Sequence, residues 1–235
     1  MPILTSQVVR CEALNDFVYR VTLQFSEPVS FKAGQYLMVA MSATDLRPFS
    51  IASAPIVGGN TTIDLHIGAT PENPYAWEVI EQMRTSGEVT VHIPAGTATY
   101  VAESERPILL LAGGTGFSYT WSLLQHHINS NSKRPLTLFW AVRKQKDLYL
   151  HEQVERLAAK HEHIRYIPVV EEQPTEIANA VHAQLIPAVI NSGLVLGDYD
   201  VYIAGRFEMV AAARTAFSQA GLPSSQLFGD ALAFI

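Results

Sequence analysis

A glycine turn between a buried strand and a helix is the strongest chemical signal in the sequence. Gly113, Gly114, Thr115 and Gly116 directly follow the apolar run 107–112. Glycines in this position let a phosphate approach the backbone, and the N–H groups that open the following helix face the anion. The spacing differs from GxGxxG, so a tight strand-to-helix turn that needs positive φ is an equally good interpretation.

A second segment combines a cation, a rigid backbone, an aromatic face and hydroxyl groups. It reads Arg47-Pro48-Phe49-Ser50, with Ser53 three residues later. Pro48 fixes the backbone, Phe49 offers a flat apolar surface, and the serines offer hydrogen bonds. Arg47 supplies a positive charge for a phosphate or a polar tail. Taken alone, the segment also fits a strand that turns its serines to solvent.

The elements that position the second segment are expected to be short strands. Apolar and polar residues alternate in several stretches of the first part of the chain. The expected strands are 17–25, 35–41, 62–67 and 89–93. One helix is expected at 75–84, because Pro74 suits a first helical turn and Gly87 follows its end. Strands at this spacing indicate a sandwich or a barrel.

The elements that position the glycine turn follow a different pattern, in which strands and helices alternate. The run 107–112 suits a parallel strand buried on both faces. After it we expect helices at 119–129, 153–161, 181–190 and 208–220, and strands at 136–142, 165–170 and 200–204. Such alternation implies right-handed βαβ units and a parallel sheet. The sequence therefore predicts an α+β protein of two domains, an antiparallel β-barrel at 1–103 and a nucleotide-binding α/β domain at 104–235.

Composition excludes several classes of function. The 235 residues are 48% hydrophobic and 16% charged, which is typical of a globular protein. A net charge of -6 without a basic block argues against a nucleic-acid partner. Cys11 is the only cysteine, so an internal disulfide, a thiolate zinc site and an iron–sulfur cluster are excluded, and no metal site is expected. The longest apolar run, 108–112, is too short to span a bilayer, so we expect a soluble, cytoplasmic protein without a membrane partner.

In this order, the two segments resemble motifs of the ferredoxin–NADP+ reductase superfamily. There, Arg-x-Tyr/Phe-Ser-x-x-Ser lies on the barrel and binds flavin, and Gly-Gly-Thr-Gly opens the pyridine-nucleotide domain. The resemblance covers nearly the whole chain. Residues 66–69 match the strand laid against the flavin ring, 204–206 match the Cys-Gly-Pro segment beside the nicotinamide, and 228–235 match the aromatic C-terminus near the flavin.

Two departures make the chain most similar to bacterial NAD(P)H–flavin reductases, which include enzymes that supply reduced FMN to luciferase. Members that hold FAD permanently usually carry a Gly-x-Ser/Cys-Ser turn before the helix. Here 71–77 has no such turn, and Glu72 would oppose a pyrophosphate. Ala204 replaces the cysteine. The resemblance implies that FMN, FAD or riboflavin is an exchangeable substrate, reduced by NADH or NADPH for an acceptor such as luciferase, a monooxygenase or a ferric iron complex.

The resemblance also implies roles for individual residues. Ser50 is expected to be catalytic, through a hydrogen bond at flavin N5. The residues expected to bind flavin are Tyr36, Arg47, Pro48, Phe49, Ser50, His66, Ile67, Gly68 and Phe228. Those expected to bind the nucleotide are Leu111, Ala112, Gly113, Gly114, Thr115, Gly116, Gly205 and Arg206.

Several alternatives stay open at the level of sequence. Arg143, Lys144 and Lys146 either bind a 2′-phosphate, which would favour NADPH, or form a solvated turn. His66 is either a proton donor or a half-buried strand histidine. The competing functions are an FAD-holding reductase that feeds an oxygenase or haem partner, and a nucleotide-sensing subunit without turnover. The preferred flavin, the acceptor and the oligomeric state are not determined by the sequence.

Overall fold

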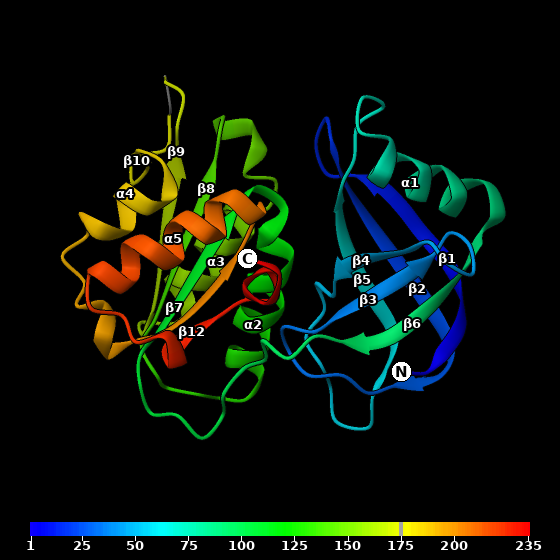
Figure 1. Cartoon of the computed structure of the whole chain (residues 1–235), viewed down its shortest axis with the longest axis horizontal. Helices are drawn as coiled ribbons and strands as arrows, with labels where there is room; N and C mark the ends of the chain where they lie inside the picture. Colours follow the sequence, from blue (N-terminus) through cyan, green and yellow to red (C-terminus); the bar gives the residue numbers. More distant parts are fainter. Residues whose placement is uncertain (174–175) are drawn as a thin grey trace. The chain divides into compact units, whose positions relative to one another are not determined.

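A computed structural model of the chain describes residues 1–173 and 176–235, which form two compact units (Figure 1). One unit comprises Met1–Tyr100 with Trp121–Ser130, and the other comprises Val101–Thr120 with Asn131–Ile235. The first contains an antiparallel sheet and the second a parallel one, so the expected fold class is confirmed. Within the described residues, no helix is long and apolar enough to cross a membrane.

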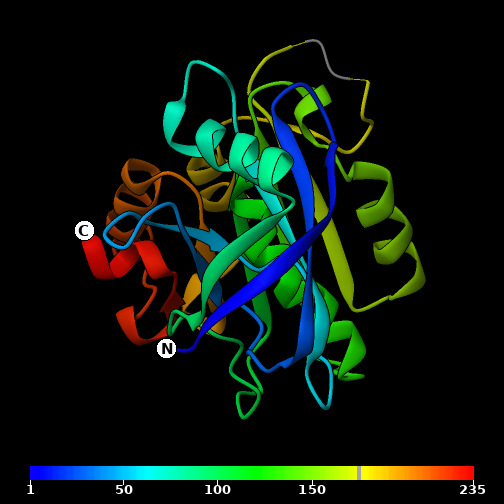
Figure 2. The ribbon, with the colours of Figure 1, turned by 90° about the vertical axis from the view of Figure 1, so that its right-hand side faces the viewer.

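The first unit is a six-stranded antiparallel barrel, whose strands run across the view in Figure 2. The strands follow the order β4-β3-β6-β1-β2-β5, and a bridge between Ile51 and Leu65 joins the chain just after β4 to β5. Their bounds are β1 (Ile3–Ala13), β2 (Val18–Val29), β3 (Tyr36–Ala40), β4 (Leu46–Ser50), β5 (Asn60–Gly68) and β6 (Glu88–Ala95), with helix α1 at Pro74–Ser86 between β5 and β6. Alternate residues point inward, and on β5 these are Ile63, Leu65 and Ile67, which are fully buried.

Two strands of the barrel, β1 and β4, were not predicted from the sequence pattern. In β1 only Ser6 is buried, so its apolar residues do not alternate cleanly with polar ones. The strand forms because it pairs along its length with β2 and β6. β4 is the segment that carries Arg47 to Ser50, and it forms an antiparallel pair with β3. Pairing with other strands of the sheet therefore determined both elements.

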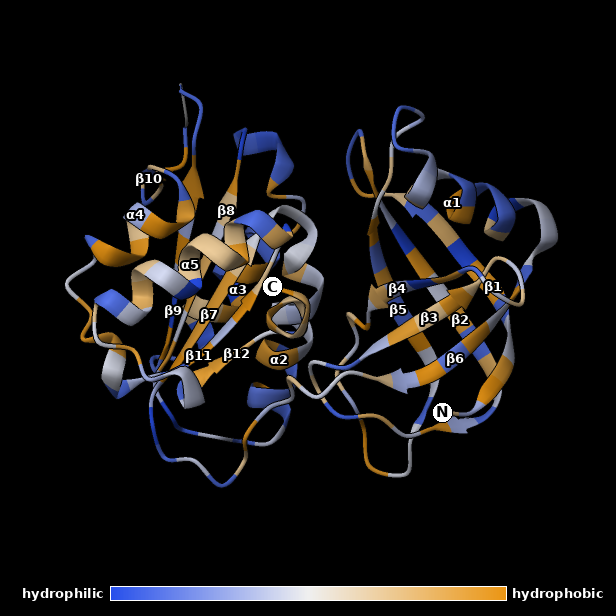
Figure 3. Cartoon of the chain, viewed as in Figure 1, coloured by the Kyte–Doolittle hydropathy of each residue, from blue (hydrophilic) through white to orange (hydrophobic). Residues whose placement is uncertain are grey.

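The second unit is a parallel sheet with the order β10-β9-β8-β7-β11-β12. The strands are β7 (Ile108–Gly113), β8 (Leu136–Val142), β9 (Ile164–Val170), β10 (Val181–His182), β11 (Asp200–Ala204) and β12 (Leu227–Phe228). The helices are α3 (His151–Lys160), α4 (Leu185–Ile190) and α5 (Phe207–Gln219), together with the first turn of α2 (Phe117–Asn129), whose residues from Trp121 onward belong to the first unit. Hydrophobic residues run continuously along the central strands (Figure 3), as burial on both faces requires.

One expected element of this unit is wrong. The sequence predicted a helix over 181–190, but Val181 and His182 extend the sheet edge by pairing with Val169 and Val170. The helix α4 begins only at Leu185. Its Pro187 lies in the first turn, where a missing N–H costs little. The apolar pattern of this stretch is compatible with a helix or a strand. Residues 181–182 form a strand because the edge of β9 offers backbone hydrogen-bond partners.

Candidate functional site

The glycine turn lies at the point where the order of the parallel sheet reverses. From β7 the chain builds β8, β9 and β10 to one side, and then β11 and β12 to the other. Ala112 at the end of β7 pairs with Ala204 at the end of β11, so the turns after these strands are neighbours. Helix α2 begins after one turn and α5 after the other. A switch point with helix N-termini at the carboxyl ends of the strands is the usual place for a nucleotide in an open α/β sheet.

The two turns fit together so closely that side chains are excluded. A Cβ on Gly116 would lie 2.2 Å from the carbonyl oxygen of Ala204, and one on Gly113 would lie 2.6 Å from Sδ of Met209. Gly114 has a φ of +56°, and nothing surrounds the place where its Cβ would be. The glycines therefore serve two purposes. Gly113 and Gly116 allow the two turns to pack closely, and the backbone of Gly114 remains exposed to a ligand. We name these two turns, 113–116 and 204–206, the nucleotide cradle.

An aromatic cluster supports the cradle from the next strand. The indole Nε1–H of Trp140 on β8 donates to the carbonyl oxygen of Gly114 at 3.0 Å. Its ring stacks on Phe117 at 3.7 Å, and Tyr149 packs edge-on against both rings. Because a trans peptide directs its C=O and N–H oppositely, the N–H of Thr115 points away from Trp140. A hydrogen bond to a backbone carbonyl 26 residues away leaves no local signal in the sequence, so sequence reasoning did not find this role of Trp140.

The remaining residues expected to bind nucleotide or flavin in this unit differ in what they can offer. The side chains of Leu111 and Ala112 are fully buried in β7, so only their backbone can contact a ligand. Arg206 is exposed and precedes α5. Phe228 on β12 stacks on Tyr202 at a centroid distance of 4.9 Å.

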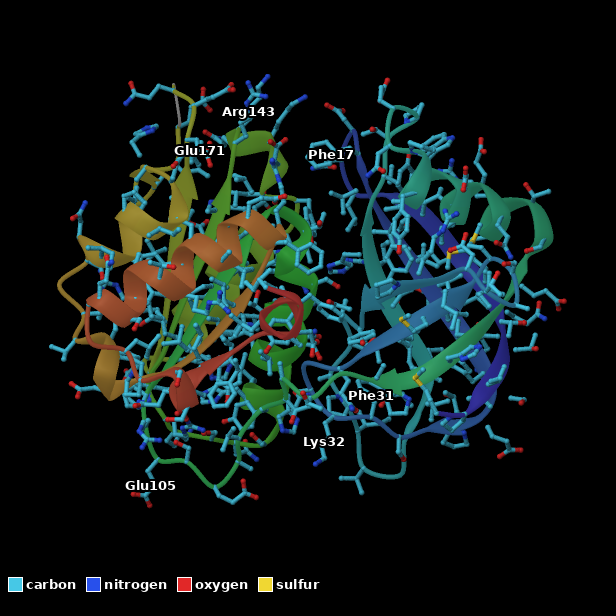
Figure 4. The ribbon with its side chains drawn as sticks, viewed as in Figure 1. Phe17, Phe31, Lys32, Glu105, Arg143 and Glu171 are labelled. Carbon is cyan, nitrogen blue, oxygen red and sulfur yellow. The ribbon has the colours of Figure 1, made fainter. Side chains whose placement is uncertain are left out.

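The basic run after β8 is largely paired with carboxylates. Arg143 and Lys144 both contact the carboxylate of Glu172, the latter at 3.8 Å. The backbone N–H of Lys144 donates to Asp147. Figure 4 labels Arg143 and Glu171, which lie at the same end of the sheet, after β8 and β9. This pairing weakens the case for a dedicated 2′-phosphate site, although the exposed Arg143 remains accessible to solvent.

In the barrel, the register of β3 and β4 sorts the expected flavin residues onto two faces. Directly paired residues share a face of the sheet. Phe49 pairs with Leu37 and Arg47 with Val39, and both partners are core residues, so Phe49 and Arg47 face inward. Ser50 pairs with Tyr36, and Pro48 is two residues before it, so these three face outward together. We name Tyr36, Pro48 and Ser50 the outer face of β3–β4.

Strand β5 lies next to the end of β4, because Ile51, directly after β4, forms a bridge with Leu65 of β5. The side chain of Ile67 lies in the barrel core, whereas His66 and Gly68 belong to the opposite face of the strand. His66 is nonetheless buried, and burial followed by the charge of Arg20 lowers its pKa to about 3. The imidazole is therefore neutral at physiological pH, which favours a packed histidine over an imidazolium proton donor.

Arg47 is held by neighbours that the sequence reasoning missed. Its Nε and Nη2 donate to the carboxylate of Asp45, Nη2 also to Glu78 at 2.8 Å, and Nη1 to the carbonyl oxygen of Tyr75. The Tyr75 ring lies 4.8 Å from its Cζ. Hydrogen bonding to Asp45, more than that to Glu78, raises the pKa of Arg47 above its usual range. Asp45 stands two residues before Arg47, a same-face spacing on a strand that would have signalled this pair.

Comparison with known proteins agrees with the geometry of both units. Residues 110–215, which include the nucleotide cradle, match the family model described as oxidoreductase NAD-binding domain. An NAD(P)H-flavin reductase of Aliivibrio fischeri is 44% identical over 243 residues and covers 100% of both chains. The fold is similar to that of a cytochrome P450 reductase of Amycolatopsis, with a TM-score of 0.87, 21% identity, and coverage of 97% of this chain and 69% of that one.

A second relative extends the sequence similarity. An NAD(P)H-flavin reductase of Vibrio harveyi is 45% identical over 222 residues, which are 92% of this chain and 93% of that protein. Identity at this level across both the barrel and the parallel sheet goes beyond a shared fold. The chain belongs to the family of NAD(P)H-flavin reductases.

Proposed function

We propose that the chain oxidises NADH or NADPH and transfers the hydride to a flavin that binds and leaves as a substrate. The nicotinamide and the flavin supply the redox chemistry, and the protein supplies binding, orientation and electrostatics. The observation that carries the proposal is the nucleotide cradle at the switch point, on a chain whose β4 also carries Arg47-Pro48-Phe49-Ser50.

The cradle suits the pyrophosphate of a pyridine nucleotide. The exposed backbone of the turn at Gly114, just before α2, offers N–H donors, and Arg206 adds a cation before α5. Trp140 fixes the carbonyl of Gly114 on the side away from the N–H of Thr115. We assign the nucleotide phosphates to Gly113, Gly114, Thr115 and Gly116, with Gly205 and Arg206 beside them.

For the flavin we assign the ring to the outer face of β3–β4 and to the backbone of β5. Ser50 would hydrogen-bond at flavin N5, where the hydride arrives. Phe49 and Arg47 would support this outer face from inside the barrel, because their side chains face the barrel interior. Ile67 would contribute only its backbone, since its side chain is fully buried.

The start of α1 supports flavin exchange. Asn73 at its N-cap makes no side-chain capping hydrogen bond, and Pro74 at the first position has no N–H to offer. A pyrophosphate would therefore find few donors there, and Glu72 is close in sequence. We propose that reduced flavin leaves for an acceptor such as luciferase, a monooxygenase or a ferric iron complex. A cytoplasmic site of action fits the single cysteine, Cys11.

A substitution of Ser50 tests the flavin half of this proposal. Losing one donor at a site of developing charge lowers turnover by about 10²-fold, so Ser50→Ala should reduce kcat by that factor with the fold intact. Thr62→Ala is the matched control, because Thr62 is an exposed hydroxyl residue on β5 of the same barrel. A Ser50→Ala variant with the kcat of the wild type would remove Ser50 from the mechanism.

A further inference from the structure

An oxidisable side chain, the thioether of Met209, lies beside both turns of the nucleotide cradle. A Cβ on Gly113 would meet its Sδ at 2.6 Å, and one on Gly205 would meet its Cε at 2.5 Å. The same side chain therefore fills the space next to one glycine of each turn. Met209 itself belongs to the first turn of α5 and packs against the hydrophobic core of the second unit.

Met209 combines this position with partial access to solvent. Its side chain is half-buried, and the nearby backbone of Gly114 is exposed. Hydrogen peroxide is little larger than water, so partial exposure is sufficient for it to reach the sulfur and oxidise it. By contrast, Met83 is 1% exposed in the barrel core. Met209 is also the only methionine after residue 83, so its modification can be measured separately from that of the others.

The reduction of flavin gives rise to an oxidant for this side chain whenever the product meets no acceptor. Dioxygen oxidises released reduced flavin in solution and is itself reduced to hydrogen peroxide. Peroxide then transfers one oxygen atom to the thioether sulfur: the O–O bond breaks, an S–O bond forms, and water leaves with both protons. The sulfur is oxidised by two electrons to a sulfoxide, and the peroxide is reduced by the same two electrons.

A sulfoxide at Met209 would fit poorly beside the two turns. Oxidation turns a flexible apolar side chain into a polar, chiral one with an additional oxygen atom. The sulfur already lies 2.6 Å from the place of a Cβ on Gly113, and the core against which Met209 packs is hydrophobic. The new oxygen must therefore displace the turns or the start of α5. The N–H groups that we assign to the nucleotide phosphates move with the turns.

We propose that Met209 is a modification site, at which oxidation by hydrogen peroxide weakens the binding of NADH and NADPH. The modification slows the enzyme when reduced flavin reacts with dioxygen instead of reaching an acceptor. This inference rests on the proposed function, because it needs the nucleotide in the cradle and the release of reduced flavin.

The test treats the flavin-free protein with hydrogen peroxide and then removes the peroxide with catalase. Three quantities are measured: the gain of one oxygen in the peptide that contains Met209, by mass spectrometry; the Kd of NADH without flavin, by NADH fluorescence; and kcat/KM for NADH at saturating riboflavin. Met209→Leu is the test variant, because leucine has a similar volume and no sulfur. Met41→Leu is the control, since Met41 is a half-buried methionine of the barrel. Each protein is compared with its own untreated sample.

In wild type and in Met41→Leu, we expect peroxide to raise the Kd of NADH and to lower kcat/KM by about tenfold, as overpacking at a close contact does. Methionine sulfoxide reductases that act on both epimers should restore the untreated values. Met209→Leu should keep its untreated values. The inference would be overturned by a wild-type protein that carries the sulfoxide at Met209 and binds NADH unchanged, by a Met209 that peroxide leaves unmodified, or by an equal loss in Met209→Leu.

A second experiment uses the peroxide that turnover itself produces. Wild type is incubated in air and in the dark with NADH and riboflavin, with and without catalase. We expect the sulfoxide at Met209 to accumulate only without catalase, and turnover that leaves Met209 unmodified would contradict the inference. A protein that does not oxidise NADH when flavin is added would instead overturn the proposed function, which the treatment with added peroxide does not require.

Discussion

Replacing Gly116 with alanine should disable the nucleotide cradle through a backbone collision. The new Cβ would lie 2.2 Å from the carbonyl oxygen of Ala204 and 2.4 Å from its carbon, whereas ordinary contact begins at 3.4 Å. Neither atom belongs to a flexible side chain, so the two turns must separate by about 1 Å in an otherwise close-packed region. Overpacking of this kind costs about 1–3 kcal/mol.

Most of that free-energy cost should appear as a lower kcat/KM for the nucleotide, because the N–H groups of the turn move with the backbone. A cost of about 2.7 kcal/mol corresponds to a 100-fold lower kcat/KM for NADH. Gly113→Ala is the matched comparison, since its Cβ would meet only the flexible end of Met209, at 2.6 Å. We expect a loss of less than about tenfold there, restored by Met209→Ala in the same chain.

The assay measures initial rates of NADH oxidation at saturating riboflavin, together with urea unfolding of each variant. Unfolding reveals how much of the cost falls on the fold rather than on nucleotide binding. If Gly116→Ala retained the wild-type kcat/KM for NADH, or if Gly113→Ala proved the more damaging of the two, the packing argument for the cradle would be wrong.

Two further predictions concern residues outside the glycine turn. Trp140→Phe keeps the stack on Phe117 but removes the donor to Gly114, so the KM for NADH and NADPH should rise about fivefold while the KM for riboflavin stays constant. His66, with a folded pKa of about 3, binds its proton more readily when unfolded, so it contributes stability that is complete above pH 6.5 and is lost as pH falls toward 3. Urea unfolding should show a steeper loss of stability in wild type than in His66→Gln over that window, by at most about 1.4 kcal/mol per pH unit, and parallel curves would contradict the assignment.

The two sheet types were predictable because their hydrophobic patterns differ. The strands β8 and β11 have the predicted bounds, 136–142 and 200–204, since each is a short and mostly apolar segment. β1 was not predictable, because its pairing with β2 and β6 replaces the missing alternation. The edge strand at Val181 depended in the same way on β9.

The candidate site was predictable in residue type but not in orientation. Sequence placed Arg47 and Phe49 in one segment with Ser50, and only the register against β3 separates them onto opposite faces. The carboxylate of Glu78 reaches Arg47 from 31 residues away, and Trp140 reaches Gly114 from 26. Such contacts depend on how strands and helices pack, which a linear motif does not encode.

The most direct test of the account uses protein dialysed free of ligands. NADH and NADPH consumption is followed by nicotinamide absorbance, with and without added riboflavin, FMN or FAD. We predict a colourless protein that oxidises the nucleotide only when flavin is added, with a rate that saturates in flavin. A protein that stays yellow after dialysis and reduces a dye without added flavin would contradict the central claim that flavin is a substrate.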